Sequence, residues 1–324
     1  MSGVASDLLN IECGVPQGSV LGPMLFLLYV NDMSLCSNIL KFFLFADDTT
    51  ILCSSDKLDN LYDIMNAELI HLTDWFATNK LSLNITKTNY ILFKNHKGDK
   101  DTQNIQTLLL NNNKVVQVQT TKFLGVEVDH KLNWSHHIKR VENKLSSNIY
   151  ILRKVRHKIN KQTAFLLYDT LILPHLSYCN LVWGNTFKKY LLNILRLQKR
   201  ALRVCILEKN LKSANLFSLC NRLPFELIAR YQSLQIVHQF FYDYNTLPIT
   251  ISSLLTKTSN VHQYATRAAD NLCLFIHPSK LEIRKKAFKV CVPEQWNELP
   301  LDLRYTNSFL LFKRNLKHHF LSAS

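Results

Sequence analysis

The sequence predicts an α+β protein in which a strand-rich first part with a few helices precedes a longer, mostly helical part. Residues 42–53 place two apolar runs around an acidic pair, a pattern typical of a β-hairpin. Residues 115–118 and 122–128 are again strand-like. In residues 57–80, and from residue 135 onward, apolar residues return every three to four positions, as in amphipathic helices.

The chain is long enough for more than one domain. Its 324 residues exceed the roughly 100–200 residues of one domain, and a hydrophobic content of 47% is sufficient for packed cores. The eight cysteines are scattered without a C-x-x-C pair, which favours buried thiols and an intracellular location. The longest apolar stretch, Val20–Val30, has about half of the ~20 residues that a membrane span needs, so we expect no membrane partner.

Charge is divided unevenly along the chain. Residues 1–80 contain three lysines against ten acidic residues, a net charge of −7, whereas residues 81–324 carry +22 and give the whole chain its formal charge of +15. An acidic segment joined to a strongly basic remainder suits an enzyme that holds a metal ion and grips a polyphosphate backbone. A solvated basic surface is the alternative interpretation.

The first element is a glycine-rich loop that leads into a helix. Gly14, Gly18 and Gly22 lie within nine positions, where the backbone can turn tightly or approach a ligand closely. Pro23 stands where a first-turn proline belongs, and the apolar residues after it predict a mostly buried helix. Gln17 and backbone N–H groups of the loop would then be free to face a nucleotide.

The second element is a hairpin that carries two adjacent carboxylates. We expect strand Phe42–Ala46 to pair with strand Thr49–Cys53, with Asp47 and Asp48 at or near the turn. Neighbouring carboxylates repel each other unless a cation lies between them. Hard oxygen ligands without accompanying Cys or His residues favour Mg²⁺ or Mn²⁺. A plain polar turn is the alternative, since Asp is common in turns.

The remaining elements follow in order. Residues 57–80 predict a helix capped by Asp56, and residues 81–93 predict two short strands around Asn84–Thr88. Asn111–Asn113 is a predicted turn. The helical part is expected to contain a basic helix at 135–157, a helix at 165–173 stopped by Pro174, and helices at 190–205, 224–244 and 309–321, whereas residues 245–306 show few clear periods.

Two strings identify a family resemblance. The sequence GVPQGSVLGPMLFLLYVND at Gly14–Asp32, followed by FADDT at Phe45–Thr49, resembles the reverse transcriptases of non-LTR, LINE-class retrotransposons, in particular the jockey-like group. The string HLSYCNLVWGNT at His175–Thr186 resembles a later part of the same proteins. The resemblance extends from about residue 12 to the C-terminus.

The resemblance implies a domain arrangement and roles for individual residues. Residues 1–133 would be part of a polymerase palm, 134–187 a helical thumb, and 188–324 a basic, mostly helical C-terminal region. RNA template, DNA primer and deoxynucleoside triphosphates would be the partners, and Mg²⁺ (or Mn²⁺) the cofactor. The implied residues are Asp47 and Asp48 for catalysis and metal binding; Pro16, Gln17, Gly18 and Lys87 for nucleotide or template; Phe123, Leu124 and Gly125 for the primer grip; and Lys139, Arg140 and Lys144 for the nucleic-acid backbone.

Alternatives remain for single residues and for the chain. Lys87 is more simply interpreted as an exposed loop lysine, and a β-bulge accounts equally well for Gly125. Family members place another catalytic aspartate before the glycine-rich loop, where this chain offers only Asp7 and Glu12, so an N-terminally truncated fragment that is inactive alone is expected. The open readings are an incomplete chain of an active polymerase, a remnant without catalysis, and a non-catalytic nucleic-acid-binding module that uses the basic helices.

Overall fold

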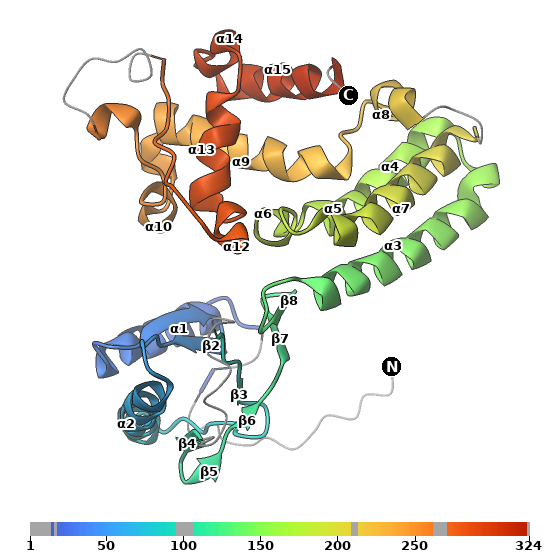
Figure 1. The fold of residues 1–324 in the computed structure, drawn as a ribbon. Helices are drawn as coiled ribbons and strands as arrows, with labels where there is room; N and C mark the ends of the chain where they lie inside the picture. Colours follow the sequence, from blue (N-terminus) through green and yellow to red (C-terminus); the bar gives the residue numbers. More distant parts are fainter. Residues whose placement is uncertain (1–13, 16–17, 95–105, 209–212, 262–270, 323–324) are drawn as a thin grey trace, which may run out of the picture. The chain divides into compact units, whose positions relative to one another are not determined.

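A computed structural model describes residues 14–15, 18–94, 106–208, 213–261 and 271–322 of the chain (Figure 1). The chain divides into two compact units, Met1–Gln119 and Thr120–Ser324. The fold is α+β, as the sequence predicts, with helices in both units and small two-stranded sheets. The proposed borders at residues 133 and 187 stay predictions. Asp7, Glu12, Pro16 and Gln17 lie outside the described residues.

The first unit combines two longer helices with short strands. Antiparallel pairs are formed by β1 with β2 and by β4 with β5, while β3 and β6 pair in parallel. The bounds are α1 Gly22–Val30, η1 Asn31–Cys36, β1 Lys41–Phe45, β2 Asp48–Leu52, α2 Leu58–Thr78, β3 Asn89–Tyr90, β4 Leu109–Leu110, β5 Asn113–Lys114 and β6 Val116–Gln117. The Asn111–Asn113 turn is confirmed, because Asn111 and Asn112 have φ angles of 53° and 61° and connect β4 to β5.

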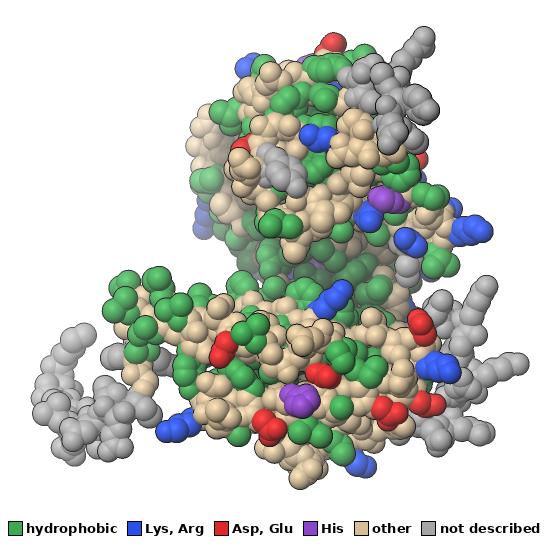
Figure 2. All heavy atoms as spheres, turned by 90° about the vertical axis from the view of Figure 1, so that its left-hand side faces the viewer, with side chains coloured by type: hydrophobic (Ala, Val, Ile, Leu, Met, Phe, Trp, Pro, Cys, Tyr) green, Lys and Arg blue, Asp and Glu red, His purple; other side chains and the backbone are tan. Residues whose placement is uncertain are grey.

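The core of the first unit is small and leaves α1 largely uncovered. Tyr62, Leu69 and Leu72 of α2 form its centre with Val30 and Met33. The prediction of a mostly buried helix after Pro23 is wrong, since Val30 is the one buried residue of α1. The helix is apolar all round, and no second layer of described residues covers its other sides. Exposed hydrophobic side chains are visible on this unit (Figure 2).

Two local predictions in the first unit also need correction. Helix α2 is confirmed, but its N-cap is Lys57 in extended backbone without a side-chain cap bond, so Asp56 does not cap it. Of the two strands expected around Asn84–Thr88, the described structure contains only β3. The preceding residues form a turn instead, in which the backbone N–H of Lys87 donates to the Asn84 carbonyl at 3.1 Å.

The second unit begins with a hairpin and continues as a helical body. The hairpin strands are β7 Thr120–Phe123 and β8 Val126–Asp129. The α-helices are α3 Ser135–Val155, α4 Lys161–Leu171, α5 Leu173–Ser177, α6 Asn180–Trp183, α7 Lys188–Ile206, α8 Ser213–Cys220, α9 Phe225–Tyr242, α10 Ile249–Ser252, α12 Glu282–Lys285, α13 Phe288–Asn297, α14 Leu301–Arg304 and α15 Phe309–Ser322; the short 3₁₀ segments are η2 Arg156–Lys158, η3 Tyr244–Thr246 and η4 Thr258–Asn260.

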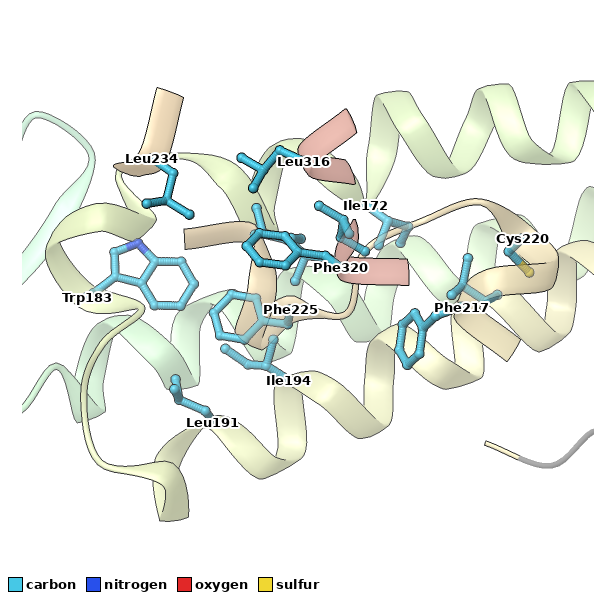
Figure 3. Close-up of a cluster of buried hydrophobic side chains, with 14 of the residues drawn as sticks. Ile172, Trp183, Leu191, Ile194, Phe217, Cys220, Phe225, Leu234, Leu316 and Phe320 are labelled. Carbon is cyan, nitrogen blue, oxygen red and sulfur yellow. The ribbon is translucent and has the colours of Figure 1, made fainter. Parts of the chain in front are cut away.

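A continuous hydrophobic core holds the second unit together. Helix α3 packs against α7, and α9 is contacted by α13 and α15 (Figure 1). Trp183 is fully buried, and its ring stacks on Phe225 with centroids 5.3 Å apart (Figure 3). The fully buried Gln198 connects three segments, because its amide donates to the Tyr168 hydroxyl and the Leu223 carbonyl and accepts from the Phe225 N–H.

The predicted helices of the second unit are confirmed, with two differences. Pro174 does not simply stop a helix; it occupies the first turn of α5, where its missing N–H costs nothing. Residues 245–306 contain α13, which has Pro293 inside it and a weak periodic pattern. No helix among the described residues has the length and apolar character needed to cross a bilayer.

Candidate catalytic and nucleic-acid-binding sites

The acidic pair lies at the tip of the β1–β2 hairpin. Phe45 pairs with Asp48, so Ala46 and Asp47 form the two-residue turn and Asp48 is the first residue of β2. Ala46 has a φ of 50°, a left-handed conformation that short hairpin turns require. The predicted hairpin is therefore confirmed, with strands one residue nearer the N-terminus than expected.

The hairpin presents one face to the core and the other to solvent. Phe42, Leu44 and Ile51 are partly buried and pack against the core of the first unit. Paired residues of a ladder share a face, and successive residues alternate. Asp48 therefore shares the outer face with Phe45 and Phe43, which are 62% and 50% exposed. Two carboxylates and two uncovered phenyl rings meet at this end of the hairpin.

The donor chemistry at the tip fits a divalent cation only in part. Asp47 and Asp48 are exposed, adjacent carboxylates, and neither has a recorded hydrogen bond or ion pair among the described residues. Carboxylate oxygens suit Mg²⁺ and Mn²⁺. No group of three or more His, Cys, Asp or Glu residues in the described part of the chain comes together as a metal site. The described residues thus supply two ligands and not a complete coordination set.

The other predicted nucleotide-binding residues belong to the same unit. Gly18 has a φ of 85° and nothing within 4 Å of the position of an added Cβ, so it is a turn residue with open space beside it. Lys87 is exposed in the turn before β3. Its role stays a prediction.

The predicted primer-grip residues form the turn of the β7–β8 hairpin. Phe123 pairs with Val126, and Leu124 and Gly125 connect them with φ angles of 42° and 83°. This two-residue turn leaves no extra residue on either strand, so the structure does not support the β-bulge alternative for Gly125.

Both carbonyl groups of this turn accept hydrogen bonds from the helical body. The Tyr178 hydroxyl donates to the Leu124 carbonyl at 2.6 Å, and the Arg140 guanidinium donates to the Gly125 carbonyl. A Cβ on Gly125 would lie 3.2 Å from the Tyr178 ring, so only glycine fits without displacing the ring. Arg140 also lies 3.3 Å from Glu127 on β8. The hairpin tip is therefore held in a fixed position against α3.

The junction after β8 is ordered by one buried carboxylate. Asp129 is 3% exposed and accepts backbone N–H bonds from Lys131 and Asn133 through Oδ1 and from Trp134 through Oδ2. These bonds satisfy donors just before the start of α3, in the manner of a helix cap. Residues 129–134 thus turn the chain, and the Asp129 contacts fix the direction in which α3 leaves the hairpin.

A basic cavity of about 410 Å³ lies beside the hairpin tip. It brings together Gly125, Arg140 and Lys144, which the sequence assigned separately to the primer grip and to the nucleic-acid backbone. His137, His175 and Tyr178 also line it, and sequence reasoning missed them. The one available signal was the string at His175–Thr186, which carries the resemblance without indicating contact with α3. Lys139 does not line the cavity and lies 3.7 Å from Glu142.

Burial lowers the pKa of the His137 imidazole, which lines this cavity. His137 is 3% exposed, its Nδ1 accepts the Glu127 N–H at 3.3 Å, and its ring meets the Trp183 ring edge-on at 5.1 Å. Burial, and then the charge of Arg140, lower the pKa of His137 to about 4. The imidazole is therefore neutral at physiological pH, as its role as a hydrogen-bond acceptor requires.

One protein family matches the part of the chain that contains both hairpins. The family described as reverse transcriptase (RNA-dependent DNA polymerase) matches residues 2–128, a range that contains the glycine-rich loop, the acidic hairpin and almost all of the β7–β8 hairpin. Residues 2–128 are therefore similar to a reverse transcriptase domain. Members of this family use divalent metal ions and bind nucleic-acid templates and nucleotides.

The relatives are polymerases of non-LTR retrotransposons. The chain is 26% identical over 234 residues to a probable RNA-directed DNA polymerase from transposon X-element of Drosophila melanogaster, covering 66% of this chain and 25% of that protein. It is 26% identical over 213 residues to the RNA-directed DNA polymerase from mobile element jockey of the same species, covering 63% and 23%. A type-1 retrotransposable element R1 polyprotein of Bradysia coprophila is 27% identical over 184 residues, covering 55% and 18%.

The matched region is a minor part of each relative. The aligned residues span about a quarter of the length of the X-element and jockey proteins. No solved structure matches the chain.

Proposed function

We propose that this chain is part of the catalytic region of an RNA-directed DNA polymerase of a non-LTR retrotransposon. The observation that carries the proposal is the pair of exposed carboxylates at the β1–β2 tip, inside the range that the reverse transcriptase family matches. An isolated Asp-Asp turn is common, but a turn of this kind within a polymerase domain has a specific use. It supplies carboxylates for divalent ions at the site of nucleotide addition.

We assign residues 1–133 to the palm, 134–187 to the thumb and 188–324 to the C-terminal region. The exposed acidic tip in the first unit and the basic cavity beside the β7–β8 tip in the second support this division. An RNA template, a DNA primer and deoxynucleoside triphosphates are the proposed partners, and an intracellular location is the proposed setting. The comparisons do not favour a module that only binds nucleic acid, since they match the polymerase domain itself.

Asp47 and Asp48 are the residues that would hold the ion. When bound, such ions activate a primer hydroxyl and neutralise the charge of the triphosphate. The described residues provide an incomplete ligand set. The described residues hold two carboxylates side by side on a two-residue turn, and Phe42, Leu44 and Ile51 pack the other face of the hairpin against the core.

The test is to neutralise one carboxylate at a time in a complete polymerase that contains this chain, because a fragment that is inactive alone gives no extension to compare. Asp47→Asn should lower primer extension on an RNA template in Mg²⁺ at least about 100-fold, because electrostatic stabilisation of a transferring phosphoryl group is lost. Asp32→Asn, which removes an exposed carboxylate from η1 in the same unit, should leave extension within about twofold. Duplex binding should be unchanged in both variants.

A second measurement covers the metal site directly. Mn²⁺ binding followed by electron paramagnetic resonance should weaken at least about tenfold in Asp47→Asn and not in Asp32→Asn, since a carboxylate ligand is lost. Extension by the Asp47→Asn polymerase at the rate of the unsubstituted polymerase, or equal Mn²⁺ binding by all three proteins, would contradict the assignment.

A further inference from the structure

The cavity beside the β7–β8 tip is built from the turn, from α3 and from the start and end of α5. Its volume of about 410 Å³ lies within the range of small-ligand pockets, about 300–1,000 Å³. The polar side chains that line it are His137, Arg140, Lys144, His175, Ser177 and Tyr178. No Asp or Glu is among its lining residues. A cavity lined by cations and hydrogen-bond donors, without a carboxylate, selects an anion.

Arg140 is a fixed charge at one wall. Its guanidinium donates to the Gly125 carbonyl, and its Nε lies 3.3 Å from a Glu127 oxygen. These contacts hold the group in place, so it needs little reordering when a ligand enters. Because Glu127 offsets part of its charge, the free positive charge of the cavity comes from another residue.

Lys144 supplies that charge. It lies one helical turn after Arg140 on α3, is exposed, and has no recorded ion pair among the described residues. The facing wall carries His175 on α5. His175, Lys144 and Arg140 line the same cavity, and burial, followed by the charges of these two cations, lowers the pKa of His175. The neutral imidazole retains one N–H that is able to donate.

We propose that this cavity holds one phosphate group, with Lys144 as its ion partner and with Arg140 and His175 as hydrogen-bond donors. The proposal rests on the proposed polymerase function, and it adds His175 and Tyr178 to the residues that contact nucleic acid or nucleotide. The phosphate belongs either to the backbone of a bound strand or to a nucleoside triphosphate; both present negatively charged phosphate oxygens to the cavity.

Two of the residues that line the cavity also hold the β7–β8 tip. Tyr178 lines the cavity and also donates to the Leu124 carbonyl, while Arg140 donates to the Gly125 carbonyl. The walls of the cavity are thus the same groups that hold the hairpin tip. A phosphate bound in the cavity would therefore lie at a fixed position relative to the Leu124–Gly125 turn.

The experiment compares two lysines of one helix in the full chain. Lys144→Gln should weaken binding of an RNA–DNA primer–template duplex about tenfold and reduce the slope of log K against log salt concentration by about 1, because one phosphate contact is lost. Lys154→Gln removes the same charge from α3 outside the cavity and should change affinity less than about twofold. Lys144→Arg should retain most of the affinity.

Two further arms identify the source of the phosphate. If Lys144→Gln weakens binding of a deoxynucleoside triphosphate and leaves duplex binding intact, the cavity binds a nucleotide phosphate. If it weakens duplex binding and leaves triphosphate binding intact, the cavity binds a phosphate of the strand backbone. Equal losses in Lys144→Gln and Lys154→Gln, or no loss of either ligand in Lys144→Gln, would overturn the proposal. Binding is measured without divalent ions, so failure of extension in the Asp47 experiment leaves this result independent.

Discussion

The two hairpins of the chain have the same length of turn and very different surroundings. In β1–β2, Ala46 and Asp47 form the turn, and the outer face with Phe43, Phe45 and Asp48 is exposed. In β7–β8, Leu124 and Gly125 form the turn, and both carbonyl groups accept hydrogen bonds from the helical body. Among the described residues, no side-chain hydrogen bond reaches the backbone of the Ala46–Asp47 turn.

The difference shows how one local motif serves two purposes. The β7–β8 tip is fixed by donors from α3 and from the residue after α5, so it suits a role in positioning a ligand. The β1–β2 tip carries uncompensated carboxylates, so its stability in a compact site depends on a cation from outside the chain. The following predictions test whether the fixed tip and the open tip respond differently.

Lowering the pH should destabilise the second unit, which contains the β7–β8 tip, and this is the largest expected effect. The pKa of His137 is about 4 in the folded chain and about 6.5 when unfolded, so between these values the unfolded state binds more protons and stability falls as pH falls. The loss is on the order of 3 kcal/mol across this window. Protonation also removes the acceptor for the Glu127 N–H. Urea denaturation at pH 7 and pH 4.5, followed by tryptophan fluorescence, measures it.

The neighbouring histidine provides the control for that prediction. His136 is exposed and precedes His137 on α3. His136→Gln should retain the pH dependence, and His137→Gln should reduce it. Equal pH dependence in the two variants would contradict the assignment of the acid sensitivity to His137.

Exchanging glycine and alanine between the two turns should have opposite effects. Gly125→Ala should destabilise the second unit by about 1–2 kcal/mol, because φ is 83° and the added Cβ meets the Tyr178 ring at 3.2 Å. Ala46→Gly should stabilise the first unit by about 1 kcal/mol, since Ala46 already has a φ of 50°. Hydrogen exchange resolved by unit measures both; a destabilising Ala46→Gly would argue against the turn geometry.

Removing the Tyr178 hydroxyl should give the smallest effect. Tyr178→Phe keeps the ring beside Gly125 but deletes the donor to the Leu124 carbonyl. We expect faster amide exchange at the β7–β8 tip and no change at the β1–β2 tip. Tyr305→Phe, at another exposed tyrosine of the second unit, is the matched control. Unchanged exchange at Leu124 and Gly125 in Tyr178→Phe would show that Arg140 alone fixes the tip.

Much of the fold was predictable because local patterns carry it. The acidic hairpin, α2, α3, α7, α9 and α15 follow from alternation or from a three-to-four-residue period. Errors arose where tertiary contacts decide. Burial of α1 does not follow from its apolar composition, because a helix is buried only where another element covers it. Helix α13 contains Pro293 and gave little periodic signal, although Trp296 within it is fully buried.

The sequence by itself determined the family resemblance, the acidic pair and the basic character of α3, because motif sequences and charge are properties of the chain. Only the tertiary structure placed His175 and Tyr178 beside Arg140, Lys144 and the Leu124–Gly125 turn. These residues are separated by up to 54 positions in sequence. They meet because α3 and α5 pack into one core, and a contact made by packing leaves no local pattern in the sequence.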